Sequence, residues 1–216
     1  MRSIRSLCSW SGGKDSCFAL IQAIAAGHEP AVLLNVLNEA GRISRSHGIP
    51  DHLLQAQAES AGIPIHMVSS SWEEYERNFT AALIELKSTY HLTHAVFGDI
   101  DLQAHRDWEE KVCAHAGLTA DLPLWLQNRR ALAETMLRSG IETFIVSCNN
   151  TMGEGFLGKK LTIALLDELE ALGIDPCGEN GEFHTFVYDC PLFRHSVPVN
   201  ITGTHLHSDY WFASLA

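Results

Sequence analysis

The hexapeptide Ser-Gly-Gly-Lys-Asp-Ser at positions 11–16 constrains the fold of this chain more than any other stretch. A short apolar run from Ile4 to Trp10 precedes it, and apolar residues at helical spacing follow from Phe18 to Ala25. This order predicts a strand, a glycine turn and the start of a helix. Glycine lets main-chain amides approach a ligand closely, and the unpaired amides in the first turn of a helix attract phosphate. We therefore predict a phosphate-binding loop at 11–16.

The side chains of this loop suit a nucleotide. Lys14 supplies a positive charge, Ser11 and Ser16 supply hydroxyl groups, and Asp15 can hold Mg²⁺. A Walker loop would have four residues between its first glycine and its Gly-Lys pair. The stretch instead resembles the loop of the PP-loop ATP pyrophosphatases, which split ATP between the α and β phosphates to adenylate a substrate oxygen. A surface turn before a helix N-cap is the alternative. The predicted ATP-binding residues are Ser11, Gly12, Gly13, Lys14, Asp15, Ser16 and Asn35.

The composition argues against several classes of protein. The chain has 216 residues, 46% of them apolar and 19% charged, which is typical of a globular protein with one large or two small domains. It contains no apolar run of membrane-spanning length and no apolar signal-peptide segment, so we expect a cytoplasmic protein without a membrane partner. A net charge of −11 argues against broad nucleic-acid binding. The six cysteines form no C-x-x-C pair, which argues against a cysteine-ligated metal.

Strands and helices are predicted to alternate through the first half of the chain. The strands are expected at 31–37, 63–68 and 94–97, and the helices at 51–61, 73–90 and 102–116. This alternation predicts an α/β fold with a doubly wound parallel sheet and right-handed crossovers. Ligands bind such sheets at the carboxyl ends of the strands. The loop at 11–16, the segment after Leu37 and the segment 99–101 should converge there.

The second half of the chain is less regular. The expected elements are a helix at 128–139, a strand at 141–148, a helix at 159–172 and β-like segments at 183–187 and 197–206. We therefore predict an ATP-binding domain at 1–118 and a smaller α+β substrate-binding domain at 119–216.

Carboxylates outside the first loop are candidates for chemistry. Asp99 and Asp101 directly follow the third of these strands, where Asp99 could bind Mg²⁺ or cap the next helix, and Asp101 could contact substrate. Glu179 and Glu182 lie in a glycine-rich segment with Gly178 and Gly181, and two carboxylates so held suit positioning an amine and accepting its proton. An ordinary turn before a strand is the alternative.

Two further features are weaker. His47, in the loop after the strand at 31–37, could hydrogen-bond to substrate. The segment 153–159 fits G-x-x-x-x-G-K, but Lys160 stands where the Walker loop requires Ser or Thr, and Glu154 would repel phosphate. A mobile loop beside the substrate or a plain connector is the better interpretation.

Several separate stretches together resemble the diphthine–ammonia ligase family of PP-loop ATPases. They are SGGKDS at 11–16, HGIP at 47–50, FGDI at 97–100, LPLW at 122–125, FLG at 156–158 and GENGEFHTFVYDCPLF at 178–193. The resemblance implies a Rossmann-like ATP-binding domain and a smaller substrate domain. It also implies that the carboxylate of diphthine, a modified histidine of elongation factor 2, is adenylated, and that ammonia then displaces AMP.

The chain departs from this family pattern at informative places. Archaeal members tend to have GEGGE followed by an acidic residue, where Asn180 and His184 stand here. The GDI segment with a downstream arginine, Arg106, is similar to bacterial relatives. Bacteria do not make diphthamide, so a bacterial source would imply another acceptor.

The sequence thus predicts an ATP-dependent, AMP-forming ligase that amidates a carboxylate or carbonyl oxygen with ammonia. The acceptor is either a modified protein histidine of the elongation factor 2 type or a small molecule, and a second copy of the chain is a further expected partner. Alternatives are a sulfur-transfer enzyme acting on a nucleobase through Cys148 or Cys177, and a non-catalytic adenine-nucleotide sensor. The predicted catalytic residues are Lys14, Asp15, Asp99, Glu179 and Glu182; the substrate-binding residues are His47, Asp101, Gly178, Gly181 and His184; Asp15 and Asp99 would hold Mg²⁺.

Overall fold

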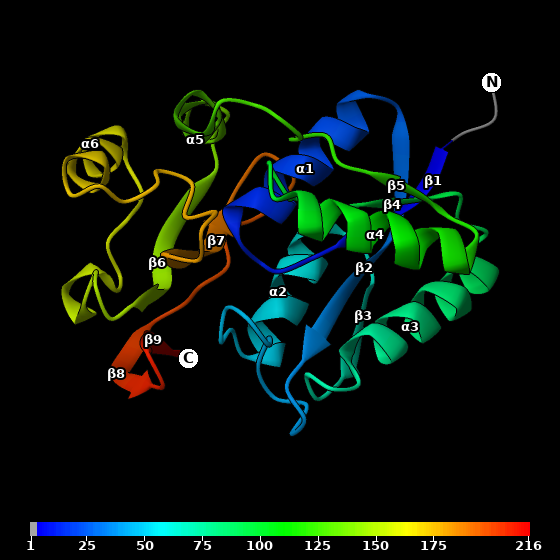
Figure 1. The fold of residues 1–216 in the computed structure, drawn as a ribbon, viewed down its shortest axis with the longest axis horizontal. Helices are drawn as coiled ribbons and strands as arrows, with labels where there is room; N and C mark the ends of the chain where they lie inside the picture. The colour runs from blue at the N-terminus through cyan, green and yellow to red at the C-terminus, as the bar shows by residue number, and fades with distance from the viewer. Residues whose placement is uncertain (1–3) are drawn as a thin grey trace.

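The first half of the chain forms a five-stranded parallel sheet with the order β3-β2-β1-β4-β5 (Figure 1). The structure is a computed structural model that describes residues 4–216. The strands are β1 (Ile4–Ser9), β2 (His28–Leu37), β3 (Ile65–Ser69), β4 (His94–Val96) and β5 (Thr119–Asp121). The helices between them are α1 (Lys14–Ala25), α2 (Asp51–Ala61), α3 (Tyr75–Tyr90) and α4 (Gln103–Ala116). The predicted doubly wound parallel sheet is confirmed.

Alternating side chains of the strands explain the two layers of helices. Cys8 and Leu33 belong to the core cluster that contains the buried residues of α1 and α2. Their neighbours Leu7 and Leu34 point to the opposite face and belong to the cluster built from α3 and α4. Because β1 pairs with β2 on one side and with β4 on the other, the loops after β1 and β4 diverge at the carboxyl edge of the sheet. A parallel sheet has its ligand crevice at such a point.

The second half of the chain forms an antiparallel sheet with the order β7-β6-β9-β8. Its strands are β6 (Glu142–Asn149), β7 (Phe183–Asp189), β8 (Ile201–His207) and β9 (Tyr210–Leu215), and its helices are α5 (Arg129–Arg138) and α6 (Ile163–Ala171). A short 3₁₀ turn, η1 (Glu154–Phe156), lies between β6 and α6. The predicted smaller α+β region is confirmed.

The boundaries of three predicted elements need correction. The helix expected from 159 begins at Ile163, because the Thr162 side chain caps it by accepting a hydrogen bond from the Leu165 amide at 3.1 Å. The strand expected at 197–206 begins at Ile201, and β9 was not predicted at all. The parallel sheet extends through β5 to Asp121, three residues beyond the predicted domain boundary at 118. The division into two domains stays a prediction.

The two sheets share one core. A single buried cluster contains Cys8 and Phe18 from the first half and Ile145 and Phe186 from the second. Gln57 of α2, which is fully buried, joins them with polar contacts: its amide donates to Gly12 O at 3.0 Å and to Val187 O at 2.6 Å. Within residues 4–216, no helix combines the length and the apolar character needed to cross a membrane.

Candidate active site

The predicted phosphate loop lies between β1 and α1, at the point where the strand order reverses. Gly12 adopts φ +83°, in the region that favours glycine, and a Cβ on Gly13 would lie 2.8 Å from His47 Nε2. The hydroxyl groups of Ser11 and Ser16 lie 3.0 Å apart, and the Gly13 amide donates to Ser11 Oγ at 3.2 Å. The first amides of α1 are thus presented in a tight turn that leaves no room for larger residues.

Lys14 connects this loop to the second half of the chain. Its ammonium donates to Cys177 O at 2.5 Å and to Asp15 Oδ2 at 2.9 Å, and its backbone amide donates to Thr185 Oγ1 at 3.1 Å. The residue is only 2% exposed. Burial, the largest single influence, would lower the pKa of Lys14, but the charge and hydrogen bond of Asp15 together with the charges of Cys177 and Glu179 outweigh it and raise the pKa, so the ammonium stays charged.

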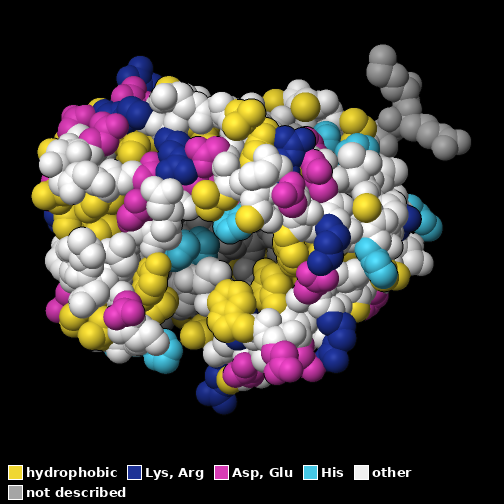
Figure 2. All heavy atoms as spheres, viewed as in Figure 1, with side chains coloured by type: hydrophobic (Ala, Val, Ile, Leu, Met, Phe, Trp, Pro, Cys, Tyr) yellow, Lys and Arg dark blue, Asp and Glu magenta, His cyan; other side chains and the backbone are white. Residues whose placement is uncertain are grey.

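A cavity of about 970 Å³ opens in front of the loop. Figure 2 shows the molecule hollowed near the centre of this face, with hydrophobic side chains along the lower edge of the hollow and histidines beside it. Nine predicted site residues line the cavity: Ser11, Asp15, Ser16, His47, Asp99, Gly178, Glu179, Gly181 and His184. The fold therefore brings four distant segments of the chain to one place.

The carboxylates in the cavity have different environments. Asp15 Oδ1 is buried without a hydrogen-bond partner, and burial raises the pKa of Asp15. Burial would also raise the pKa of Asp99, but hydrogen bonds from His105, at 2.6 Å, and from Glu109 outweigh it and lower the pKa. Glu179 accepts a hydrogen bond from the Ile100 amide at 2.9 Å, and burial raises its pKa to about 7. Glu179 can therefore exchange a proton at neutral pH.

Asp15 and Asp99 fit a magnesium ion that is held mainly by phosphate. Within residues 4–216, no three His, Cys, Asp or Glu side chains are grouped so as to hold a metal ion by themselves. Mg²⁺ in nucleotide sites is bound by one or two carboxylates and by phosphate oxygens and water. The unpaired oxygen of Asp15 has the chemistry of such a ligand.

Glu109 of α4 is a cavity residue that sequence reasoning missed. It is 3% exposed, it hydrogen-bonds to Asp99, and burial raises its pKa to about 11. At neutral pH it is therefore a carboxylic acid that donates to Asp99. Glu109 lies four residues after His105, so both side chains lie on one face of α4. This i, i+4 pair in the helix that follows Asp99 is the sequence signal that could have identified Glu109.

Two histidines from different halves of the chain meet in the cavity. The rings of His47 and His184 have centroids 4.5 Å apart. Burial lowers the pKa of both, that of His184 to about 4. Both rings are thus neutral at pH 7, and each offers one donor and one acceptor.

Six predicted residues do not line the cavity, and one of them, Asn35, lines a smaller pocket beside it. Gly12, Gly13 and Lys14 lie behind it in the loop. Asp101 accepts two hydrogen bonds from Arg129, at 2.8 and 2.5 Å, and Arg129 also donates to Asp175 at 2.6 Å. The Glu182 carboxylate accepts a hydrogen bond from the Asn180 amide at 3.1 Å. Asp101 and Glu182 therefore hold the segment 175–183 in place rather than face the cavity.

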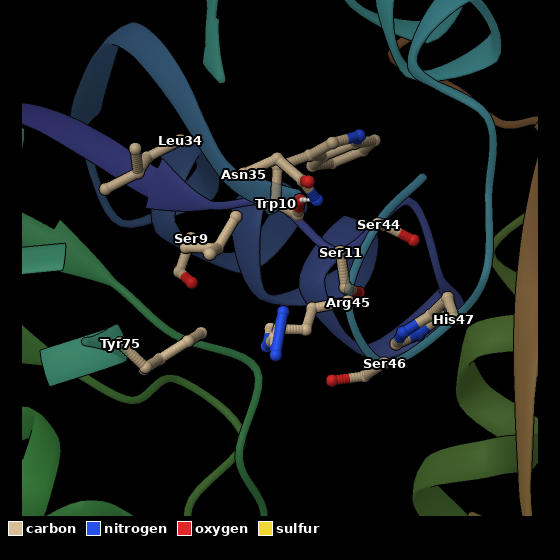
Figure 3. Close-up of a pocket in the computed structure, with 11 residues that line it drawn as sticks. Ser9, Trp10, Ser11, Leu34, Asn35, Ser44, Arg45, Ser46, His47 and Tyr75 are labelled. Carbon is tan, nitrogen blue, oxygen red and sulfur yellow. Dashed lines mark hydrogen bonds between the residues drawn. The ribbon is translucent and has the colours of Figure 1, made fainter. Parts of the chain in front are cut away.

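A smaller pocket of about 80 Å³ adjoins the cavity and shares Ser9, Ser11, Ser46, His47 and Tyr75 with it (Figure 3). Asn35 of β2 lines this pocket; its amide group donates to Trp10 O at 2.6 Å, which leaves Oδ1 buried without a partner. Arg45 lines it too, and its buried Nε is also unpaired. The residues that line the pocket thus include one buried acceptor and one buried donor without a partner. Arg45 lies in an irregular loop, so no periodicity in the sequence pointed to it.

These features define the class of protein to which the chain belongs: proteins with a Rossmann-like parallel sheet and a glycine turn of the phosphate-binding type where the strand order reverses. A second, antiparallel region closes a polar cavity over this turn.

Comparisons with known proteins narrow this class. The family models of the diphthamide synthase N-terminal and C-terminal domains match residues 4–120 and 128–215. A diphthine–ammonia ligase from Danio rerio is 30% identical over 229 residues, which cover 94% of this chain and 89% of the relative. A diphthine–ammonia ligase from Mus musculus is 29% identical, with 95% and 86% covered. The chain belongs to the diphthamide synthase family, as its motifs indicated.

One solved structure matches this chain weakly. It is described as a predicted subunit of tRNA methyltransferase from Methanocaldococcus jannaschii, and its TM-score to this chain is 0.47 at 13% identity. The match covers 87% of this chain and 98% of the other.

Proposed function

We propose that this protein is an ATP-dependent, AMP-forming ligase that activates a carboxylate of its acceptor and converts it to an amide with ammonia. The observation that carries the proposal is the placement of the loop 11–16 against the segment 178–184 across one cavity. The names of the relatives favour this amidating reaction over sulfur transfer and over a nucleotide sensor.

The nucleotide would extend from the small pocket to the first turn of α1. Asn35 Oδ1 and Arg45 Nε are the free polar atoms that could hydrogen-bond to the base or ribose. The Asp15 and Ser16 amides in the first turn of α1 and the hydroxyl groups of Ser11 and Ser16 would hold the phosphates. When bound, Mg²⁺ would neutralise phosphate charge, and Asp15 and Asp99 are its protein ligands in this proposal.

The reaction has two steps. An oxygen of the acceptor carboxylate attacks the α phosphorus, and pyrophosphate leaves near the charge of Lys14. Ammonia then attacks the activated carbonyl carbon, the C–N bond forms, and AMP leaves with the oxygen. The nitrogen loses a proton to Glu179, whose pKa of about 7 suits it to accept one at neutral pH. His47 and His184, both neutral, would hydrogen-bond to the acceptor, and Glu182 would act by holding the loop that carries Glu179.

The acceptor in this proposal bears a carboxylate, and two kinds of molecule could be that acceptor. The names of the relatives point to diphthine, a modified histidine of a protein. A small molecule is the second candidate, because Asn180 and His184 depart from the archaeal pattern.

The test is to incubate the protein with Mg²⁺·ATP, isotopically labelled ammonium and either a modified elongation factor or a metabolite extract, and to separate the nucleotides by chromatography. AMP, pyrophosphate and a labelled amide are expected.

Lys14→Ala should lower the rate of AMP formation at least about 100-fold, since it removes a charge at the departing phosphates and the contact with Cys177. Lys159→Ala is the matched control, because Lys159 pairs with Glu168 on the surface. ADP with phosphate would overturn the proposal, and ATP binding without any product would favour the sensor.

A further inference from the structure

The two edges of the antiparallel sheet differ in what covers them. The edge strand β7 lies against the first region, where the Val187 amide donates to Gly12 O at 3.0 Å. The opposite edge strand, β8, lies on the outer side of the second region (Figure 1). Within residues 4–216, no backbone group of Ile201–His207 hydrogen-bonds to an element other than β9. One side of β8 therefore presents unpaired N–H and C=O groups to its surroundings.

The pairing of β8 with β9 determines which residues of β8 have these outward groups. The two strands are joined by a two-residue turn at 208–209, and His207 pairs with Tyr210 at its base. The pair that closes such a turn is hydrogen-bonded, and hydrogen-bonded and non-hydrogen-bonded pairs then alternate along the two strands. The backbone N–H and C=O groups of Thr204 and Leu206 therefore point away from β9.

β8 lacks most of the features that protect an exposed strand edge. Such edges are commonly very short, or they carry lysine or proline. β8 has seven residues, ITGTHLH, and none of them is a lysine, an arginine, an acidic residue or a proline. Leu206 is 49% exposed and Ile201 is 42% exposed. A bulge between Ile201 and Gly203 protects one end, but the part from 203 to 207 is regular and can pair with another strand.

The distribution of charge favours a second copy of this chain as that other strand. With a net charge of −11, two copies can approach closely only through surfaces poor in carboxylates, and β8 is such a surface. The one carboxylate that hydrogen-bonds to β8 is Glu154, which accepts from the Thr204 hydroxyl. A charged peptide would find no ion-pair partner along β8 itself. An uncharged strand suits this edge, and every copy of the chain supplies one.

We propose that β8 pairs antiparallel with β8 of a second copy, which joins the two antiparallel sheets into one. The register follows from the outward groups. With the twofold axis at His205, Thr204 of each copy lies opposite Leu206 of the other, and both residues use their outward N–H and C=O groups. An axis at Thr204 would instead place Leu206 opposite Thr202, which lies in the bulge. The axis at His205 therefore satisfies more groups, and it places the two His205 residues opposite each other.

This pairing bears on the candidate active site because β9 contacts it. Tyr210 donates from its hydroxyl group to Gly181 O at 2.7 Å, and a Cβ on Gly48 would lie 2.8 Å from Phe212 Cδ1. A dimer formed through β8 would cover the strand β9 on its outer side and so stabilise the support of both cavity segments.

A cysteine substitution tests the register. All six native cysteines are buried, so a cysteine placed on β8 is an accessible thiol. His205→Cys should form a disulfide between two copies on oxidation with copper–phenanthroline, because opposite residues of a non-hydrogen-bonded pair have Cα atoms about 4.5 Å apart. His207→Cys is the matched control on the same face, since its two copies would lie ~13 Å apart along the strands. Non-reducing electrophoresis should show disulfide formation at least about tenfold faster for His205→Cys.

Analytical ultracentrifugation tests the association itself. The wild-type protein should form a species of twice the 23.9 kDa chain mass, in equilibrium with the monomer. Leu206→Glu should raise the dissociation constant at least about tenfold, because it places a carboxylate opposite Thr204 and Glu154 of the other copy, twice in each dimer. Ile84→Glu is the matched control, since Ile84 is 48% exposed but lies on α3. Both replaced side chains are exposed, so both variants are expected to fold.

Three outcomes would overturn the inference. A protein that is monomeric at every concentration would leave an extended segment of another protein as the occupant of this edge. A dimer that Leu206→Glu leaves intact would have to form through another surface. Equal disulfide formation by His205→Cys and His207→Cys would contradict the pairing at His205. None of these measurements depends on the formation of AMP, so the proposed function stands or fails separately.

Discussion

Lys14 carries its charge in an almost fully buried position, and its surroundings compensate for the lost hydration. The ammonium contacts the Asp15 carboxylate and Cys177 O, and it lies 5.3 Å from the centroid of the Phe183 ring. Two of these three partners come from the second half of the chain. The charge of Lys14 therefore stabilises the contact between the loop 11–16 and the segment 175–183 as well as any bound phosphate.

Glu179 predicts a pH dependence of stability. Its pKa rises from an ordinary 4.5 to about 7 on folding, chiefly because of burial. Between these values the unfolded chain has lost the proton and the folded protein retains it, so the free energy of unfolding falls as pH rises through this window, by at most about 1.4 kcal/mol per pH unit. Glu179→Gln lacks this titration. The stability of the variant relative to wild type, measured by urea unfolding, should therefore increase from pH 4.5 to 7 and stay constant above.

The test must compare Glu179→Gln with the wild-type protein, because other groups also make stability depend on pH. Folding lowers the pKa values of His47 and His184. Below the ordinary histidine pKa the unfolded chain therefore binds more protons than the folded protein, and the free energy of unfolding falls as pH falls. These histidines affect wild type and variant alike. A difference that does not change with pH would contradict the assigned pKa of Glu179.

At the scale of elements, the site depends on one close approach between the loop after β4 and the start of α1. A Cβ on Gly98 would lie 2.8 Å from Asp15 C and 2.8 Å from Ser16 N, both backbone atoms. Glycine lets Asp99, the next residue, stand beside Asp15. The backbone of the loop 11–16 thus packs directly on the chain segment that carries the second carboxylate.

Gly98→Ala should therefore be destabilising, by about 1–3 kcal/mol, because backbone cannot yield as a flexible side chain can. Gly155→Ala is the matched control: a Cβ there meets nothing within 4 Å, and Gly155 is not among the glycines with positive φ. Its effect should lie within about 0.5 kcal/mol. Urea unfolding of both variants checks the prediction, which equal stability losses would refute.

At the scale of the whole molecule, polar contacts join two regions of different architecture. Arg129, at the start of α5, donates to Asp101 after β4 and to Asp175 before β7. The Asp175 side chain is only 5% exposed, and besides Arg129 it accepts hydrogen bonds from the Cys177 and Glu179 amides. Gln57 and Lys14 make the other polar links described above. The position of the segment 175–183 over the cavity follows from these links.

Arg129→Ala should lower the free energy of unfolding by about 2 kcal/mol, because it leaves the nearly buried Asp175 without its ion-pair partner. The expected loss is smaller than for a fully buried ion pair because the Arg129 guanidinium is partly exposed. Arg130→Ala is the control: Arg130 pairs only with Glu134, Asp167 and Glu170, on the surface of the second region. The control should change stability little. Urea unfolding measures both variants, and similar losses would show that Arg129 is not a special link between the regions.

Much of the first region could be predicted from local patterns. The runs at 31–37 and 94–97 are mainly apolar, with Asn35 and His94 as the exceptions, because those strands are covered on both faces. The segment 51–61 forms α2 with the predicted ends. The edges of the second region were less predictable. All seven residues of β8 are exposed, so that strand has no buried side to impose an alternating pattern, and β9 depends on β6 and β8 for its pairing.

Local patterns and contiguous motifs in the sequence were sufficient to predict the phosphate-type turn, the parallel fold, the family and nine of the residues that line the cavity, because each depends on neighbours close in the chain. What those residues contact follows from the fold as a whole. It directs Lys14 toward Cys177, pairs Asp101 with Arg129, places Glu109 against Asp99 and lines the cavity with Trp72, Tyr75 and Trp108. Partners far apart in the chain are joined by packing and desolvation, and those forces act only once the two sheets have closed on each other.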